Sequence, residues 1–291
     1  MKPVSWFVVL LLTASLLLVS VQLSANTLDY SRYNLGWNGT SRFFSDLNRN
    51  QVTDVTDLAA LGSFRNSLLL VIAPGRTYQP DEIAAYRGFL AHGNTIFLAD
   101  DFGTGDGLLR GVGSGITVTR SPLLSFDREY GEPGMVVVTR VKNASVPGDP
   151  SRMLLNEPSS IDGGQALVTS SFMSWVDRDR NGRIGSDEPL GRQTVLARAR
   201  VGGGEVIVLS DPGIFINAMY PGGSEWDNRK FISSLVTNTS PVLIDQVNSR
   251  TADDGGVSLA LHSVVRDPVE NFGILAAGVL ALMAAWVRRM L

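Results

Sequence analysis

One segment of the chain carries oxygen-bearing side chains at the spacing of calcium ligands. Residues 177–188 read DRDRNGRIGSDE, which satisfies the pattern D-x-[DN]-x-[DN]-G-x5-E. Ca²⁺ takes roughly six to eight oxygen ligands, and a tight loop can turn alternate side chains toward one ion. The sequence therefore predicts a structural Ca²⁺ loop whose ligands are the side chains of Asp177, Asp179, Asn181 and Glu188 and the backbone carbonyl of Arg183.

The alternative for this segment is a polar hairpin loop with Asn-Gly at its turn. The flanking residues, 165–176 and 192–201, have the composition of strands, so the segment is not part of a helix–loop–helix EF-hand. Three arginines also place positive charge beside the predicted ion, namely Arg178, Arg180 and Arg183. Both interpretations stay open on the sequence alone.

A second group of polar residues stands where predicted parallel strands end. Asp100 and Asp101 follow a strand predicted at residues 94–99, and Asp211 follows one predicted at 205–209. In an open α/β sheet the carboxyl ends of the strands form the crevice that binds ligands. The predicted ligand-binding residues at this edge are Asn38, Ser41, Arg76, Asp100, Asp101, Asp211 and Asn228. The alternative is that Asp and Asn only cap helices and turns there.

The same residues restrict the reactions that the chain could catalyse. Asp100, Asp101 and Asp211 could serve a hydrolase as metal ligands or as an acid/base pair. The chain has no cysteine, which excludes disulfides, thiolate metal sites and a cysteine nucleophile. His92 stands at the end of a predicted helix and His262 in a polar stretch near the C-terminus, so neither is well placed as a general base. The sequence therefore favours a domain without catalytic activity.

Alternating strands and helices must position these residues. Two strand–helix–strand units are predicted, at residues 67–99 and 205–244. In the first, a continuous apolar run ends at Ala73, as in buried parallel strands, and a segment with helical spacing and an acidic first turn begins at Pro80. Short runs of β-forming residues separated by Gly and Pro lie between the two units. The predicted fold is an α/β domain with a parallel core sheet and a β-rich insertion.

The two ends of the chain have the composition of membrane segments. Residues 4–23 are nearly all apolar and residues 272–287 are uncharged, and about 20 such residues cross a bilayer. Lys2 and Arg288-Arg289 flank their outer ends, which predicts two spans in the cell membrane with both termini cytoplasmic and the main domain extracytoplasmic. The predicted parts are an N-terminal signal-anchor or transmembrane helix at 1–25, an extracytoplasmic α/β domain at 26–247, a juxtamembrane linker at 248–270 and a C-terminal transmembrane helix at 271–291.

Several blocks of the sequence resemble one family. They are Tyr33-Asn34-x3-Asn38-Gly39-Thr40-Ser41, residues 68–109, residues 206–217 and Asp227-Asn228-x2-Phe231. In this order they resemble the family called domain of unknown function 4350, over about residues 34–245. The resemblance implies membership of the class I glutamine-amidotransferase-like superfamily, with a flavodoxin-like α/β fold and a neighbourhood of MoxR-type ATPases and transglutaminase-like membrane proteins. It implies no established reaction, and the nucleophilic Cys of the amidotransferases has no counterpart here.

Charge and composition complete the functional prediction. The net charge of −3 and the pI of about 5.5 give no basic surface for nucleic acid. We predict a non-catalytic, membrane-anchored extracytoplasmic domain that binds a ligand or a protein partner within a membrane complex. One alternative is a hydrolase that uses the strand-end aspartates, and another is a Ca²⁺-dependent surface module.

Overall fold

The computed structural model describes residues 27–47, 52–127, 131–223, 225–237 and 241–251. The chain divides into two units, one of Leu28–Ala252 and one of Met1–Thr27 with Asp253–Leu291. All described residues except Thr27 belong to the first unit. Residues 248–251, assigned to a linker from the sequence, pack against the sheet, because Ser249 Oγ accepts the Ile72 amide at 3.0 Å and Pro74 bridges to Ser249.

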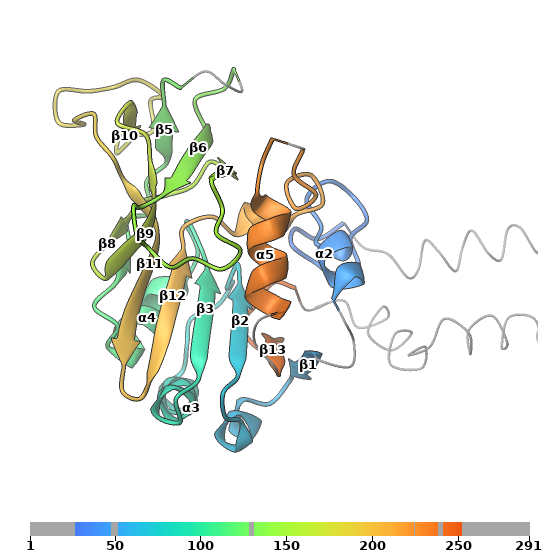
Figure 1. The fold of residues 1–291 in the computed structure, drawn as a ribbon. Coiled ribbons are helices and arrows are strands. Elements are labelled where there is room, and N and C mark those ends of the chain that lie inside the picture. The colour runs from blue at the N-terminus through green and yellow to red at the C-terminus, as the bar shows by residue number, and fades with distance from the viewer. Residues whose placement is uncertain (1–26, 48–51, 128–130, 224, 238–240, 252–291) are drawn as a thin grey trace, which may run out of the picture. The chain divides into compact units, whose positions relative to one another are not determined.

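A nine-stranded mixed sheet forms the centre of this unit (Figure 1). Its strand order is β1-β13-β2-β3-β12-β11-β9-β6-β7. The strands from β1 to β12 in this order are parallel, and β11, β9, β6 and β7 continue the sheet in antiparallel pairs. The bounds are β1 Val52–Val55, β2 Leu68–Ile72, β3 Thr95–Ala99, β6 Met135–Arg140, β7 Arg152–Asn156, β9 Gln165–Ser170, β11 Thr194–Val201, β12 Gly204–Leu209 and β13 Val242–Asp245.

Two short antiparallel pairs complete the β structure. They are β4 with β8 and β5 with β10, with bounds β4 Thr117–Val118, β8 Ile161–Asp162, β5 Leu123–Ser125 and β10 Ser174–Val176. The helices are α2 Ser41–Asp46, η1 Leu58–Ser63, α3 Pro80–Ala91, α4 Gly105–Val112, η2 Pro212–Phe215 and α5 Asn228–Thr237. The β-rich insertion is therefore partly an extension of the main sheet rather than a separate layer.

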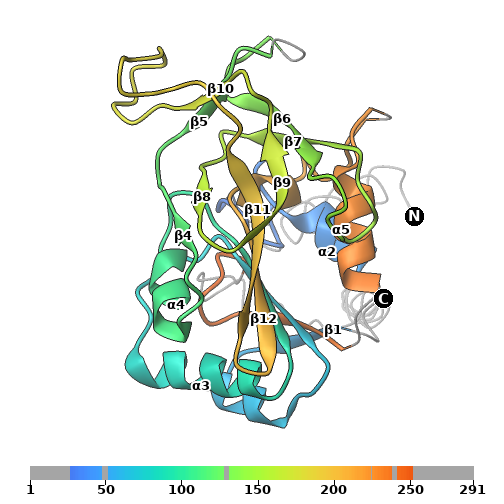
Figure 2. The same ribbon diagram turned by 60° about the vertical axis from the view of Figure 1, so that its left-hand side comes forward.

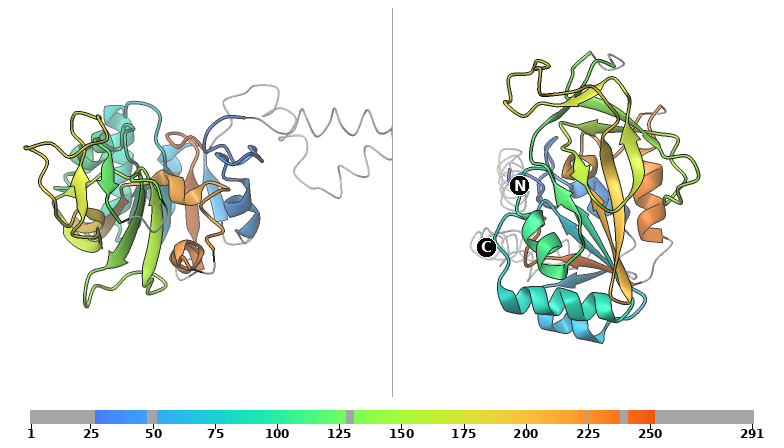
Figure 3. Two further views of the ribbon diagram at one scale, coloured as in Figure 1. Left: turned by 90° about the horizontal axis from the view of Figure 1, so that it is seen from above. Right: turned by 90° about the vertical axis from the view of Figure 1, so that its left-hand side faces the viewer.

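Helices cover both faces of the parallel strands (Figures 2 and 3). In β2, Leu70 and its alternate neighbours pack with side chains of α2, η2 and α5 on one face. Leu69 and Val71 pack with η1, α3 and α4 on the other face. All five residues of β2 are buried, which explains a continuous apolar run instead of an alternating pattern.

The strand–helix–strand unit predicted at residues 67–99 is present as β2, α3 and β3. Helix α3 begins at Pro80, whose missing amide is harmless in a first turn. Gln79 and Glu82 form a capping box in front of it. The chain reverses after α3 through Gly93, whose φ of 81° suits glycine. The second unit is present as β12, α5 and β13, with α5 beginning at Asn228.

The flavodoxin-like strand order implied by the resemblance is wrong. Numbered along the chain, the five parallel strands lie in the order 1-5-2-3-4, whereas flavodoxin-like sheets have the order 2-1-3-4-5. The difference arises because α5 returns the chain across one face of the sheet and inserts β13 between β1 and β2. Apolar runs identify strands, but they do not encode which neighbour each strand chooses.

The predicted transmembrane helices and the two-span location in the cell membrane also need correction. Among the described residues, no helix is long and apolar enough to cross a bilayer. The longest of these helices, α3, has 12 residues, whereas a span takes about 20. The segments 1–25 and 271–291, on which that prediction rested, lie outside the described residues.

Candidate functional site

The connections after β3 and β12 leave the sheet toward opposite faces. After β3 the chain enters α4, which packs on the face of α3, and after β12 it enters η2 and then α5 on the other face (Figure 2). Because β3 and β12 are neighbours, their carboxyl ends form a topological switch point. Open α/β sheets bind their ligands in the crevice outside such a point. Asp100 and Asp101 follow β3, and Asp211 follows β12 shortly after its end.

Asp100 is buried and holds the loop that leads into α4. Its carboxylate accepts the Gly103 amide at 3.1 Å and the Gly105 amide at 2.7 Å. Burial raises the pKa of Asp100 to about 7, and the charge of Asp101 adds to the rise, although the two amides act in the opposite direction. A Cβ at Gly105 would lie 2.6 Å from this carboxylate, so glycine is needed for the loop to close around it.

Asp211 is completely buried and joins β12 to β7. Its carboxylate accepts the Asn156 amide at 2.8 Å and the Gly213 amide at 2.6 Å. The second bond caps η2. Burial raises the pKa of Asp211 to about 8, against the effect of both amides, and Asp101 and Glu157 raise it further. Near neutral pH this side chain therefore exists in protonated and ionised forms.

Asp101 is the partly exposed carboxylate of the edge. It accepts the amide of the next residue, Phe102, at 2.6 Å. Burial raises its pKa, Glu157 raises it further, and Arg250 acts in the opposite direction. Burial also raises the pKa of Tyr30, followed by the charges of Asp101 and Asp211, so the phenol stays protonated and can donate a hydrogen bond. The charges of Asp101, Asp211, Glu157 and Arg250 thus act on one another or on Tyr30, and we call these five residues the edge site.

Three residues around the carboxyl edge have left-handed backbone. They are Tyr30 with φ 62°, Ala73 with φ 47° and Glu157 with φ 49°. Ala73 directly follows β2, and its amide donates to the Ala99 carbonyl at 2.8 Å. Non-glycine residues in this region cost about 1 kcal/mol or more each, and they gather at functional sites. The cost is consistent with a sheet edge shaped for something other than stability.

Three members of the edge site were missed in the sequence analysis. Tyr30 lies on an N-terminal loop, Glu157 lies between β7 and β8, and Arg250 lies in the segment assigned to a linker. None of them follows a predicted parallel strand, so the rule of strand ends does not find them. Their presence depends on long-range packing of three separate connections.

Two predicted site residues belong instead to a polar cluster that fixes the N-terminal loop. Asn38 Oδ1 accepts from Asn34 Nδ2 at 2.9 Å, and Ser41 Oγ accepts from Asn217 Nδ2 at 3.0 Å. Asn217 Nδ2 also donates to the carbonyls of Asn34 and Gly36, at 3.0 and 2.7 Å, and Asn217 Oδ1 accepts the Arg42 amide at 2.9 Å. Their hydrogen bonds therefore connect the loop to the segment after η2, which fits the alternative of structural capping.

Arg76 and Asn228 are also engaged by the protein itself. Arg76 pairs with Glu82 at the start of α3 and donates through Nε to the Val247 carbonyl at 3.0 Å. Its pKa is raised, chiefly by the hydrogen bond to Glu82. Asn228 is 1% exposed, and its amide binds both the N–H and the carbonyl of Leu154, at 3.0 and 2.8 Å. Of the seven predicted residues, the edge site therefore includes Asp101 and Asp211, with Asp100 beside them.

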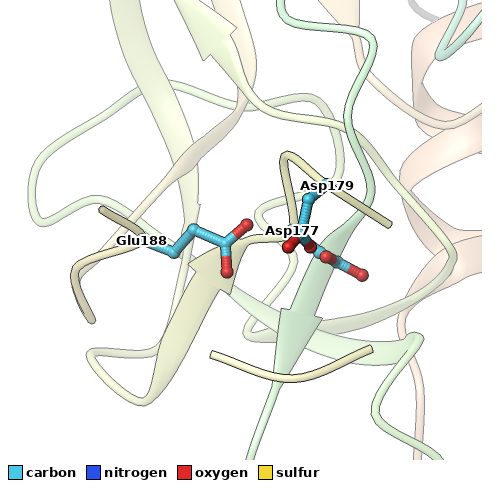
Figure 4. A group of neighbouring side chains, drawn as sticks. All are labelled: Asp177, Asp179 and Glu188. Carbon is cyan, nitrogen blue, oxygen red and sulfur yellow. The ribbon is translucent and has the colours of Figure 1, made fainter. Parts of the chain in front are cut away.

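The loop 177–188 brings three of its four acidic side chains together, namely Asp177, Asp179 and Glu188 (Figure 4). In the described part of the chain, Asp177, Asp179 and Glu188 are the one group of three acidic, His or Cys residues whose ligand atoms lie within 4.8 Å of one another. Asp177 and Glu188 are 3% and 2% exposed. The strand-end aspartates 100, 101 and 211 do not meet the same criterion among these residues.

Backbone amides already bind these loop carboxylates. Asp177 accepts the amides of Asn181 and Gly182, at 3.1 and 2.8 Å, and Glu188 accepts those of Arg178 and Gly185, at 2.6 and 2.8 Å. The Asn181 side chain donates to Asp179 at 2.7 Å, and its Oδ1 accepts the Arg183 amide at 2.7 Å.

Two of the loop arginines point elsewhere. Arg178 donates to the Asp187 carbonyl at 3.2 Å. Arg180 donates to the Arg120 carbonyl at 3.0 Å and lies 5.3 Å from the centre of the Phe102 ring. Each guanidinium is thus held by a group other than the three carboxylates. The positive charge that argued against an ion in the sequence is therefore directed partly away from the loop centre.

Comparisons with known proteins give a family and distant structural similarity. The N-terminal domain of mmIFT52 has a TM-score of 0.48 and 14% identity, covering 67% of this chain and 85% of that chain. A β-galactosidase from Bacillus circulans sp. alkalophilus has a TM-score of 0.37 and 14% identity, covering 60% of this chain and 23% of that chain. The β-galactosidase of the Antarctic haloarchaeon Halorubrum lacusprofundi has a TM-score of 0.32, 14% identity and the same coverages. No curated protein matches the chain in sequence.

These structural similarities are too distant to carry an argument about function. The similar region is less than a quarter of each galactosidase chain. The family comparison is stronger, because the model described as Domain of unknown function (DUF4350) matches residues 32–236, more than two thirds of the chain. The protein therefore belongs to the DUF4350 family.

Proposed function

We propose that the domain binds a small polar ligand at the edge site and catalyses no reaction of its own. The observation that carries the proposal is the gathering of Asp101, Asp211, Glu157 and Tyr30 at the switch point between β3 and β12, with Arg250 as the neighbouring cation. Acidic groups outnumber basic ones there. A ligand that carries positive charge or donates several hydrogen bonds matches this arrangement.

The three carboxylates at this edge have different roles in the proposal, two of them structural and one in ligand binding. Asp100 and Asp211 each hold two amides of other residues, so their oxygens maintain the loops around the site. Asp101 accepts the amide of its neighbour Phe102 and its own amide, holds no residue from another segment, and is partly exposed. Asp101 is therefore the carboxylate that we expect to contact the ligand, with Tyr30 as a donor beside it.

The lack of cysteine and the position of His92 support a binding role over a hydrolase. The chain has no cysteine. His92 is the C-cap of α3, next to the start of β3, so it lies at the amino edge of the sheet and far from the switch point along β3. His262 lies outside the described residues. An acid/base mechanism would have to use Asp100, Asp101 or Asp211, and the oxygens of Asp100 and Asp211 already accept backbone amides.

Substitution of Asp101 by Asn should abolish binding of a cationic probe. In the full-length protein, we expect 1,4-diaminobutane to shift the NMR amide signals of Gly103, Gly105 and Gly213, because these amides adjoin the edge carboxylates. Asp101→Asn should weaken that response at least about tenfold, since charge-assisted hydrogen bonds are lost. The neutral diol 1,4-butanediol should give a smaller response than the diamine.

Glu205→Gln is the matched control, because it removes an acidic charge at the start of β12, at the opposite edge of the sheet. It should leave the response to the diamine unchanged. The proposed role of the edge site is ruled out if the diamine does not shift these amide signals. It is also ruled out if the diamine shifts them equally in Asp101→Asn and in the unmodified protein.

We also infer a relationship to the class I glutamine-amidotransferase-like superfamily, without its reaction. The support is the order of sequence blocks over residues 34–245 and a parallel core covered by helices on both faces. The strand order 1-5-2-3-4 distinguishes this sheet from the flavodoxin-like order. A missing cysteine nucleophile makes glutaminase chemistry incompatible with this chain.

As a second function we propose that the loop 177–188 binds Ca²⁺ as a structural ion. The support is the complete spacing of ligand types and the proximity of Asp177, Asp179 and Glu188. The competing arrangement is a loop closed by amides alone, since amides already occupy these carboxylates. Thermal unfolding separates the two.

Calcium should raise the melting temperature of the full-length protein relative to EDTA. A ligand at about 100 times its Kd stabilises the folded state by about 2.7 kcal/mol, which corresponds to several degrees for a domain of this size. Asp177→Asn should remove the increase. Asp187→Asn takes the same charge from the same loop at a residue that is not a predicted ligand, so it should retain the increase. Equal melting temperatures in Ca²⁺ and EDTA would show that the loop is closed by its amides.

A further inference from the structure

A cavity of about 370 Å³ lies beside the loop 177–188, away from the residues of the edge site. It is bounded by residues around β4 and β8, by the loop itself and by Gln193 in front of β11. Ligand pockets in proteins generally start at about 300 Å³. The proposal for the edge site uses none of the lining residues, whereas Glu188, a predicted Ca²⁺ ligand, also lines the cavity.

Paired hydroxyl groups line one side of the cavity. Thr119 Oγ1 lies 3.0 Å from Ser160 Oγ, and the Ser160 amide donates to Thr119 Oγ1 at 3.2 Å. The Thr119 amide in turn donates to the Ser160 carbonyl at 2.9 Å. The two segments are therefore fixed to each other, and their hydroxyls can still accept or donate one further hydrogen bond.

The loop wall of the cavity is held in place by hydrogen bonds within the chain. Glu188 accepts the amides of Arg178 and Gly185, at 2.6 and 2.8 Å, and the Arg178 guanidinium donates to the Asp187 carbonyl at 3.2 Å. The negative charge of Glu188 is thus engaged by its own loop. These bonds need no ion, so the proposal for this cavity does not depend on Ca²⁺.

Two opposite charges remain on the cavity wall, and they come from different elements. Arg178 belongs to the loop and Asp162 belongs to β8. Both residues are exposed, and the ion pairs among the described residues include no contact between them. A guanidinium favours a carboxylate partner, and a carboxylate favours an ammonium. One charge of each sign also selects against ligands that carry a single charge.

We propose that this cavity binds a small zwitterion of the amino-acid class. Its carboxylate pairs with Arg178, its ammonium pairs with Asp162, and the hydroxyls of Thr119 and Ser160 bind the polar groups between them. This binding is separate from that of the edge site, because no residue is shared. With solvent-exposed charges the affinity is modest, with a Kd of about 1 mM.

The test uses a length series of ω-amino acids: glycine, β-alanine, 4-aminobutanoate and 5-aminopentanoate. Binding to the full-length protein is followed by NMR through the amide signals of Thr119, Ser160 and Gln193, in EDTA so that Ca²⁺ plays no part. We expect at least one member to bind, and the matching fatty acid and alkylamine of equal length to bind at least about tenfold more weakly. Arg178→Gln and Asp162→Asn should each weaken binding at least about tenfold.

Arg183→Gln is the matched control, since Arg183 lies on the same loop and does not line the cavity. It should bind the zwitterion like the unmodified protein. The backbone amide of Arg178, which holds Glu188, is retained in Arg178→Gln, so that variant keeps the loop closed. The proposal fails if no member of the series binds at concentrations well above the expected Kd of about 1 mM. It also fails if a singly charged analogue binds as tightly as the zwitterion, or if Arg178→Gln and Asp162→Asn bind the zwitterion as the unmodified protein does.

Discussion

The protein should be more stable near pH 5 than near pH 8, by several kcal/mol. Two buried carboxylates produce this result, because burial raises the pKa of Asp100 to about 7 and that of Asp211 to about 8. In the unfolded chain both groups ionise with the ordinary aspartate pKa of 3.8. Calorimetric melting temperatures of the full-length protein from about pH 5 to about pH 8 measure the effect.

The sign follows from proton binding. Between the unfolded and the folded pKa, the folded state holds a proton that the unfolded state has lost, so stability is fully present below about pH 4 and falls as pH rises through 7 and 8. Each carboxylate contributes up to about 1.4 kcal/mol per pH unit. The raised pKa values of Asp101 and Asp245 act in the same direction. The pKa of Asp227 is lowered, and its stabilisation is lost only on acidification below the ordinary aspartate pKa of 3.8, outside this window.

Neutral variants assign the effect to its source. Asp211→Asn should reduce the fall of the melting temperature with pH up to about pH 8, and Asp100→Asn should reduce it up to about pH 7, because each variant removes one titrating group. Either variant can be destabilised at every pH by the loss of an amide acceptor, so the slope and not the absolute melting temperature is compared. A melting temperature that rises from pH 5 to pH 8 would contradict the assignment.

Substitution of Gly39 by Ala should destabilise the protein by about 3 kcal/mol. A Cβ at this position would lie 1.9 Å from the Asn34 carbonyl oxygen, which is backbone and cannot rotate away. The Gly39 carbonyl also accepts the Asn217 amide at 2.7 Å, so the segment cannot shift without breaking the polar cluster of the N-terminal loop. For a domain of this size the melting temperature should fall by about 10 °C.

The matched control is Gly62→Ala, in which the new Cβ meets nothing within 4 Å. Its effect should stay within about 1 kcal/mol of zero, since it mainly restricts the unfolded chain. Because the Tyr30 amide donates to the Asn38 carbonyl at 2.9 Å, Gly39→Ala should also displace Tyr30 and weaken the response to 1,4-diaminobutane. Equal melting temperatures of the two variants would show that the loop tolerates the added methyl group.

Local pattern predicted the individual elements well and their arrangement poorly. The apolar run of β2, the capped helix α3 and the strand β3 carry their signals within a few residues. The position of β13 between β1 and β2 depends on where α5 packs, and no short segment encodes that choice. The same limit applies to the insertion, whose strands β11, β9, β6 and β7 extend the main sheet.

For the candidate site too, some residues could be predicted from the sequence and others could not. Asp100, Asp101 and Asp211 follow strands directly, so the rule of strand ends located them. Tyr30, Glu157 and Arg250 arrive from three separate connections and carry no local signal. Asn38, Ser41 and Asn228 match family blocks, and in the structure their side chains bind neighbouring groups of the protein. Polar residue type alone does not distinguish a ligand contact from an internal hydrogen bond.

The end of the nine-stranded sheet at β7 is shielded against joining another chain. An edge strand normally offers free N–H and C=O groups on which a second molecule can polymerise. Here the Asp227 amide donates to the Arg152 carbonyl at 2.8 Å, the Asn228 amide group takes both groups of Leu154, and Asp211 accepts the Asn156 amide. Side chains at the start of α5 and after β12 thus stand where an additional strand would pair. Asp211 therefore has a second consequence, because its carboxylate accepts the Asn156 amide where a neighbouring strand would pair and so protects this edge against aggregation.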